Sequence, residues 1–302
     1  MTISQWNKSL SLGLLFFLSI SYVLYGQNDT NNNALADTGS KGSAVFPKNS
    51  LFATAGFGSN MIFLGSTISQ NRPFYSTGLV YGFRNSIYLS ASATHIEGMD
   101  PFLAYYSAAA DYKHTFNSWF DISAEISGYK PAPSLEQTLF NEFIFANFTA
   151  GFDWKILYTR ISTGALFSEN TTGYIQVSNS RYFQTPEFFK GRSYISFNPE
   201  INMLFGDIGT LETTTGERQE SYTPPFLNTR KDPPPSNDSY SSRFGPMNFE
   251  FSLPVTLNYS KFSLEADPCY ILPAFRNSTS QVPQGFTIYI TASFRLFQSI
   301  LK

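Results

Sequence analysis

Residues 249–272, FEFSLPVTLNYSKFSLEADPCYIL, decide the fold class. Every second residue from Phe249 to Leu257 is apolar, and the residues between them are polar or proline. After Tyr259 and Ser260 the same alternation resumes at Phe262. A period of two predicts β-strands, because successive side chains of a strand point to opposite faces. The stretch therefore predicts two antiparallel strands joined by a tight turn, each with one apolar and one polar face.

Strand length and composition place these strands in a membrane. A tilted strand of about 10 residues crosses the hydrocarbon core of a bilayer. Aromatic residues make up 17% of the chain and charged residues only 14%, whereas soluble domains carry about 25% charge. The net charge of -2 argues against a nucleic-acid partner, which requires a basic face. We expect a barrel with an apolar outer face surrounded by lipid.

The N-terminus predicts export. Lys8 precedes the apolar run 10–25, and Gly26 precedes an Asn-rich segment. This pattern predicts a cleaved signal peptide, 1–26, and a flexible leader, 27–49; an uncleaved membrane anchor is the alternative. Only helices and closed barrels satisfy every backbone polar group in lipid. The predicted location is therefore the outer membrane of a Gram-negative envelope, reached through the signal peptide.

The alternation recurs along the chain as hairpins. Short turns are predicted at 84–85, 115–117, 155–156, near Gly206 and at 259–260. Longer segments are predicted at 97–101, 130–141, 169–191, 214–246 and 273–284. Outer-membrane barrels show this asymmetry, with short periplasmic turns and long external loops.

The strand count follows from the hairpins and from the expectation that both ends of the chain lie on the periplasmic side, which requires an even number of strands. The five hairpins supply ten strands, the last strand covers 285–297, and 51–69 is expected to be one bulged crossing that breaks at 56–59. The predicted fold is all-β: a transmembrane up-and-down antiparallel β-barrel of about 12 strands. It spans 50–297 and is followed by a C-terminal tail, 298–302.

Several stretches resemble a group of outer-membrane β-barrel proteins of Bacteroidetes-type bacteria. They are FGSNMIFLGSTIS, FNSWFDISAEISGY, FDWKILYTRIS, SRYFQTPEFFKGRSYISFNPEINMLFG and FEFSLPVTLNYSKFSLEADPCYILP. The predicted cleavage before Gln27 is similar to the signal peptides of that phylum. The resemblance covers nearly the whole mature chain and implies a barrel without a catalytic signature. The chain departs from the pattern at its C-terminus, because such barrels often end on an aromatic residue and Phe297 is followed by five more residues.

The polar phase of the strands supplies the candidate site. Acids outnumber bases there, although Lys113 and Lys261 share the phase. Such a lumen would attract cations or polar solutes; alternatively, the groups pair with one another and fill a closed interior. The candidate lumen-facing residues are Asp111, Asp121, Glu125, Asp153, Arg160, Glu200, Glu250, Glu265, Asp267 and Arg295.

No enzyme, metal or cofactor is predicted. The two histidines, His95 and His114, are expected at opposite membrane surfaces, so they cannot share one site. The carboxylates are spread over many strands and lack calcium-binding spacing. Cys269 falls on the polar phase and is expected to be an ordinary wall residue.

Aromatic residues at strand ends predict girdles at the two membrane surfaces; a sugar-binding platform is the alternative. They are Phe102, Tyr112, Phe143, Trp154, Tyr158, Tyr194, Tyr259 and Phe262. The Pro-rich, charged segment 214–246 is expected to be an external loop and a place for an extracellular ligand.

The predicted function is a monomeric channel or transporter for small polar or cationic solutes. One alternative is a surface-binding or structural barrel with a filled lumen that acts through loop 214–246. Others are a membrane-embedded lipid hydrolase or acyltransferase, and a soluble two-sheet binding protein.

Overall fold

The computed structural model describes residues 47–136, 138–169, 171–189, 191–212, 218–221, 226, 239–274 and 283–300. The predicted signal peptide, 1–26, and residues 27–46 of the predicted leader lie outside the described residues. Within the described part, no helix is both long and apolar enough to span a membrane.

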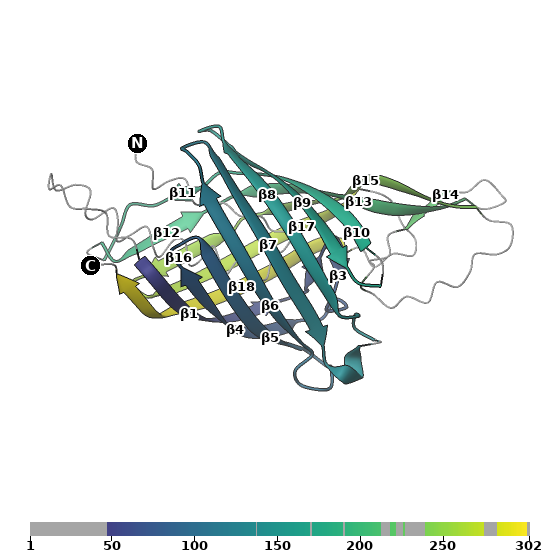
Figure 1. Ribbon diagram of the computed structural model, residues 1–302, viewed down its shortest axis with the longest axis horizontal. Helices are drawn as coiled ribbons and strands as arrows, with labels where there is room; N and C mark the ends of the chain where they lie inside the picture. The colour runs from purple at the N-terminus through teal and green to yellow at the C-terminus, as the bar shows by residue number, and fades with distance from the viewer. Residues whose placement is uncertain are drawn as a thin grey trace.

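The strands form one closed antiparallel barrel of twelve crossings (Figure 1). Each crossing pairs with its neighbours in the chain, and the last, β18, pairs with both β17 and β1. The predicted fold class is therefore confirmed. The crossings are β1 (Pro47–Gly58), β4 (Phe74–Phe83), β5 (Ile87–Ile96), β6 (Tyr105–Thr115), β7 (Phe120–Pro131), β8 (Phe143–Asp153), β9 (Tyr158–Phe167), β10 with β11 (Thr171–Ser180, Phe183–Gln184), β12 with β13 (Ser193–Phe197, Glu200–Glu212), β15 with β16 (Ser239–Ser252, Val255–Tyr259), β17 (Phe262–Pro273) and β18 (Gly285–Ile300).

The alternation of residues sorts side chains between the outside and the inside of the barrel. On β15, β16 and β17, Phe251, Leu257 and Leu264 are exposed, whereas Glu250 and Glu265 between them are buried. The same alternation holds around the barrel, so its outer face is largely apolar. An apolar band on a closed barrel is the surface that a bilayer requires.

Three neighbouring crossings are interrupted along their length. Two of the interruptions fall at Pro199, between β12 and β13, and at Pro254, between β15 and β16. Proline has no N–H to donate to a ladder. Its carbonyl still accepts: Asn198 N–H donates to Pro254 (3.1 Å), and Arg181 N–H donates to Pro199 (3.2 Å). The wall therefore remains hydrogen-bonded across the breaks.

The two ends of the barrel differ in their connections. At one end, called here the short-turn end, the connections include 84–86, 116–119, 154–157 and 260–261. At the other, the long-loop end, β13 and β15 continue beyond their neighbours and β14 (Arg218–Ser221) adds to β13. Figure 1 shows this small sheet projecting from the barrel. A 3-10 helix, Pro133–Leu135, lies in the connection between β7 and β8 at the same end.

Two predicted boundaries are wrong, and their errors cancel in the strand count. The turn expected near Gly206 does not exist, because β13 runs through this residue and pairs with β15 on both sides of it. The segment 169–191, expected to be an external loop, contains the crossing β10. An added Cβ at Gly206 would collide with the Met247 sulfur and lie 3.1 Å from the Tyr174 ring. The glycine therefore permits close packing in the interior.

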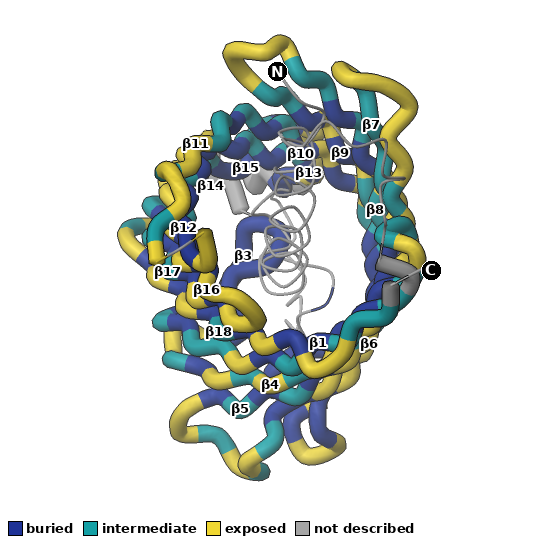
Figure 2. Tube along the Cα trace, turned by 90° about the vertical axis from the view of Figure 1, so that its left-hand side faces the viewer, coloured by how far each residue is buried: buried dark blue, intermediate teal, exposed yellow. Residues whose placement is uncertain are grey.

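The predicted limits of other strands also change. β18 continues to Ile300, into the expected tail, and β15 begins at Ser239, inside the expected loop 214–246. β1 runs from Pro47 to Gly58, so the crossing begins inside the expected leader and does not extend over 59–69. Its register against β18 shifts between Leu51 and Phe52, not at the expected break 56–59. Residues 59–73 instead turn into the barrel and form the hairpin β2 (Ile62–Phe63) and β3 (Ser66–Thr67). Figure 2 shows this segment, the inner hairpin, inside the ring of strands.

The girdle prediction holds for part of its residues. Tyr112, Tyr259 and Phe262 are exposed near strand ends, and the exposed Trp154 directly follows β8. Phe102 is also exposed, but it lies in the connection between β5 and β6. Phe143 and Tyr194 are instead buried, and Tyr158 is only partly exposed. These three were misassigned because an aromatic side chain near a strand end can point inward as readily as toward lipid.

Candidate functional site: the barrel interior

The interior is divided into a polar half and an apolar half. Inward-facing charged residues lie toward the short-turn end of their strands, as Arg160 does near the start of β9. Most large inward-facing residues toward the long-loop end are apolar, among them Phe74, Tyr105 and Phe143, and they form one cluster with residues of the inner hairpin. The polar half is the candidate site.

The ten candidate residues all lie on the inward phase of their strands. Asp121 and Asp153 are partly exposed near the short turns. The others are buried: Asp111, Glu125, Arg160, Glu200, Glu250, Glu265, Asp267 and Arg295. Lys113 also lies on this phase, whereas Lys261 is exposed in a turn. Among the described inward-facing side chains, acids therefore outnumber bases.

Four of the acids form an acidic wall, defined as Glu200, Glu250, Glu265 and Asp267 on β13, β15 and β17. The carboxylate of Asp267 interacts electrostatically with those of the other three. Neutral groups donate to two of them: Asn248 Nδ2 to Glu250 Oε1 (3.2 Å) and Thr256 Oγ1 to Glu265 Oε2 (2.9 Å). The wall thus gathers four carboxylates on three adjacent crossings.

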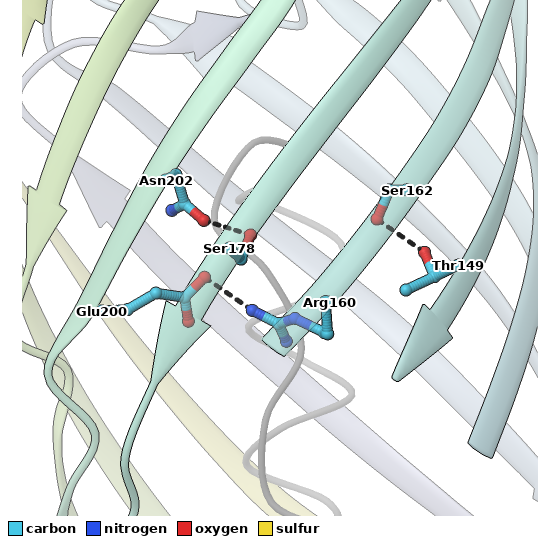
Figure 3. Close-up of polar contacts among 6 residues, drawn as sticks. All are labelled: Thr149, Arg160, Ser162, Ser178, Glu200 and Asn202. Carbon is cyan, nitrogen blue, oxygen red and sulfur yellow. Dashed lines mark hydrogen bonds and ion pairs between the residues drawn. The ribbon is translucent and has the colours of Figure 1, made fainter. Parts of the chain in front are cut away.

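One guanidinium reaches the acidic wall. Arg160 Nη2 on β9 donates to Glu200 Oε1 on β13 at 2.6 Å, passing across β10 (Figure 3). Beside this ion pair, Ser178 Oγ donates to Asn202 Oδ1, and the hydroxyls of Thr149 and Ser162 lie 2.8 Å apart. Charge-assisted bonds of this kind are stronger than neutral ones, so the pair ties β9 to β13 across β10.

The facing part of the interior carries a second charged group. Asp111 and Glu125 are direct neighbours on β6 and β7, and both interact electrostatically with Lys113. The Lys113 ammonium also lies 5.4 Å from the centre of the Tyr88 ring. Asp121 accepts hydrogen bonds from the Tyr158 hydroxyl at 2.9 and 3.0 Å. This group is therefore better balanced in charge than the acidic wall.

The inner hairpin fills the apolar half. Its two-residue tip, Leu64 and Gly65, has positive φ angles of 47° and 78°, as a type I′ turn requires. Phe63 lies 5.4 Å from the rings of Tyr129 and Phe143, on β7 and β8. Ile62 packs on the other side against Cys269 and Ile271 of β17. The inner hairpin therefore bridges two distant parts of the barrel wall.

A polar network holds the base of the inner hairpin. Asn60 Oδ1 accepts from the hydroxyls of Thr67 (2.6 Å) and Ser69 (2.9 Å), and Asn60 Nδ2 donates to Asn71 Oδ1 (2.9 Å). The backbone N–H of Met61 donates to Ser69 Oγ at 2.8 Å. Because these groups satisfy one another, the polar base can lie beside an apolar core without water.

A second segment, distant in sequence, reaches the same core. Phe226 is buried, with its ring 5.1 Å from that of Phe143 and 5.7 Å from that of Phe63. Its carbonyl accepts from Asn141 N–H at 2.8 Å. Side chains from three connections thus meet in the apolar core at the long-loop end.

The structure brings no catalytic or metal constellation together among the described residues. His95 lies at the long-loop end of β5, where Nδ1 is 2.5 Å from the Phe102 carbonyl oxygen, and His114 lies near the short-turn end of β6. No three His, Cys, Asp or Glu side chains in the described ranges are placed to hold a metal ion. Cys269 is a buried free thiol on the inward face.

Sequence reasoning missed the inner hairpin and its partners. The signal was present in IFLGST, two short runs around Leu64 and Gly65, because a glycine in the second turn position favours a tight hairpin. The contributions of Asn60 and Phe226 had no such signal.

No family model matches the sequence, and no curated protein matches it. Solved barrels are similar in architecture. LpxR from Salmonella typhimurium is 8% identical with a TM-score of 0.46, covering 80% of this chain and 99% of that one. A KdgM porin is 8% identical with a TM-score of 0.44, covering 80% and 98%, and a NanC porin is 8% identical with a TM-score of 0.41, covering 82% and 100%. At these values the likenesses carry no information on substrate or activity.

Proposed function

We propose that the protein is an outer-membrane channel for small cationic or polar solutes, closed at its long-loop end by the inner hairpin. The observation that carries the proposal is the excess of acids over bases on the inward face. A passage lined with carboxylates concentrates cations and repels anions. In this proposal the barrel is a monomer surrounded by outer-membrane lipid, the long-loop end faces the cell exterior, and no nucleic acid is bound.

The inner hairpin makes the described conformation the closed state of the proposed channel. Solutes enter the polar half from the short-turn end and meet the apolar core formed around Phe63. Passage then requires the inner hairpin to leave its place. The chain enters the hairpin from Gly58 and leaves it at Phe74, which are direct partners on β1 and β4. The hairpin's other polar contacts with the barrel include hydrogen bonds from Gln70 Nε2 to the Thr138 carbonyl (2.8 Å) and from Arg72 Nη1 to the Gly98 carbonyl (2.9 Å), both with connections and not with strands. It can therefore move without breaking a ladder of the barrel.

A second function is favoured by the apolar core itself. A barrel whose interior is permanently filled would act through its surface, and the projecting sheet of β13, β14 and β15 provides such a surface. The ligand would then be extracellular and bind at segment 214–246, much of which lies outside the described residues.

A lipid hydrolase or acyltransferase has no comparable support. Such chemistry needs a nucleophile beside a base, and His95 and His114 lie at opposite ends of the barrel. The proposal therefore includes no catalytic role.

The test is conductance in planar bilayers of the purified protein and of a variant without the inner hairpin. Because Gly58 and Phe74 are paired, an Asn-Gly turn can replace residues 59–73 and keep the register. We expect the variant to conduct steadily and to prefer cations, and Asp121→Asn with Glu125→Gln to reduce that preference. Anion selectivity would contradict the role of the acids. A hairpin-free barrel that forms but does not conduct would favour the surface-binding function.

A further inference from the structure

The acidic wall holds more carboxyl groups than the described basic side chains pair with. Glu200 is paired with Arg160, but the described partners of Glu250 and Glu265 are neutral, namely Asn248 and Thr256. Glu250, Glu265 and Asp267 are 4%, 5% and 4% exposed. Carboxylates so enclosed are costly unless a positive charge faces them.

Unused acceptor atoms converge on this wall. Glu250 Oε2 and Asp267 Oδ1 are buried and accept no hydrogen bond from a described residue, and neither does the hydroxyl of Ser252. Ser252 is 7% exposed and lies between Glu200 on β13 and Cys269 on β17, its direct partners. A neutral side chain is thus left without a partner at the centre of the acidic wall. These acceptors call for a donor that the described residues do not supply.

The spacing of the carboxylates suits an extended cation better than a metal ion. Glu265 and Asp267 are alternate residues of one strand, so their Cα atoms lie roughly 7 Å apart, and neighbouring strands are separated by about 4.8 Å. No three of these groups are placed to hold a metal ion. A linear molecule with an ammonium at each end reaches two separated carboxylates at once, and each ammonium donates up to three hydrogen bonds.

The acidic wall borders apolar residues on its side toward the long-loop end. Next along the inward face of β17 are Cys269 and Ile271, against which Ile62 of the inner hairpin packs. An alkyl chain between two ammonium groups would lie against such a surface. We propose that the acidic wall is a binding site for an aliphatic diamine. This inference rests on the proposed function and specifies its solute class.

The experiment is titration calorimetry of the purified full barrel in detergent, with 1,4-diaminobutane as the probe. The comparison ligands are 1-aminobutane, which has one ammonium group, and Mg²⁺, which carries the same double positive charge as the diamine but on a single ion. A second charge-assisted contact predicts at least about tenfold tighter binding of the diamine than of the monoamine. Glu250→Gln with Asp267→Asn should weaken diamine binding by about tenfold or more. The control Glu142→Gln removes an exposed carboxylate that lies outside the interior and pairs with Lys130 (3.0 Å), and it should leave diamine binding unchanged.

Three outcomes would overturn the inference: equal affinity for diamine and monoamine, Mg²⁺ binding as tight as the diamine, or full diamine binding by the double variant. A closed barrel resists detergent until it is heated, so unheated and boiled samples should migrate differently on a gel. Retention of this heat-dependent gel shift shows that each variant still forms the barrel. The experiments distinguish failure of the channel proposal from failure of the diamine site. Diamine binding without any conductance in the hairpin-free barrel would retain the site and reject the channel, whereas cation-selective conductance without diamine discrimination would do the reverse.

Discussion

Replacing Phe63 by alanine tests whether packing of the inner hairpin holds the barrel closed. Phe63 is 4% exposed, and its ring lies 5.4 to 5.7 Å from those of Tyr129, Phe143, Phe145 and Phe226. Truncation of a buried Phe to Ala costs about 3–5 kcal/mol. If these contacts exist only in the closed state, the ratio of closed to open barrels falls by roughly a hundredfold to several thousandfold.

The assay is the open probability of single barrels in planar bilayers. Phe57→Ala is the matched control, because Phe57 is partly exposed on β1 and contacts Tyr75, not the inner hairpin. We expect frequent openings in Phe63→Ala and wild-type behaviour in Phe57→Ala. An unchanged open probability in a Phe63→Ala barrel that retains its heat-dependent gel shift would refute the reasoning. The closure would then not depend on this core.

Three further predictions concern the wall, the packing and the orientation of the barrel. Arg160→Met leaves the Glu200 carboxylate without its ion-pair partner and should lower the free energy of unfolding by roughly 3–5 kcal/mol; urea titration should show that adding Glu200→Gln restores most of the loss. Gly206→Ala should be destabilising, because its Cβ would collide with Met247, whereas Gly173→Ala, with no atom within 4 Å of the added Cβ, should be nearly neutral in the same titration. A protease added to intact cells should cut near Arg218, Arg230 or Lys231 while the barrel stays embedded; cleavage only after the outer membrane is opened would mean that the long-loop end faces the periplasm.

The fold class could be predicted because it depends on a local property. Whether a residue such as Leu257 or Thr256 faces lipid or the interior follows from its place in a period of two, and the bilayer requires the same pattern on every strand. Turns such as 84–86 and 260–261 are also local, since a few residues with suitable backbone angles determine them. Closure with both described ends of the barrel on one side requires an even number of crossings. The predicted number, twelve, is right because the errors at Gly206 and in 169–191 cancel.

Individual boundaries failed where the local pattern was ambiguous. Thr171–Ser180 carries polar residues on both faces, so β10 lacks the clear alternation of β7. Gly206 is equally compatible with a turn and with a tight interior contact. Only the presence of Met247 and Tyr174 opposite it decides between the two.

For the candidate site, the sequence predicts only which face of each strand its residues occupy. The sequence by itself determined which acids point inward, because each belongs to a strand with a recognisable outer face. It could not determine that Glu200, Glu250, Glu265 and Asp267 meet on adjacent crossings, or that Arg160 reaches past β10 to Glu200. Those contacts depend on strand order and register, which hydrogen bonding between distant segments sets.

The division of the interior was decided by the tertiary structure alone. The apolar residues of the segment MIFLGSTIS satisfy a strand pattern as well as a folded hairpin. The hairpin is selected by the inward-facing aromatic residues of the closed barrel, such as Phe74 and Tyr289, which form one apolar cluster with it. Burial of these aromatic residues by Phe63 and Phe226 is a long-range hydrophobic effect, and no local pattern in the chain encodes it.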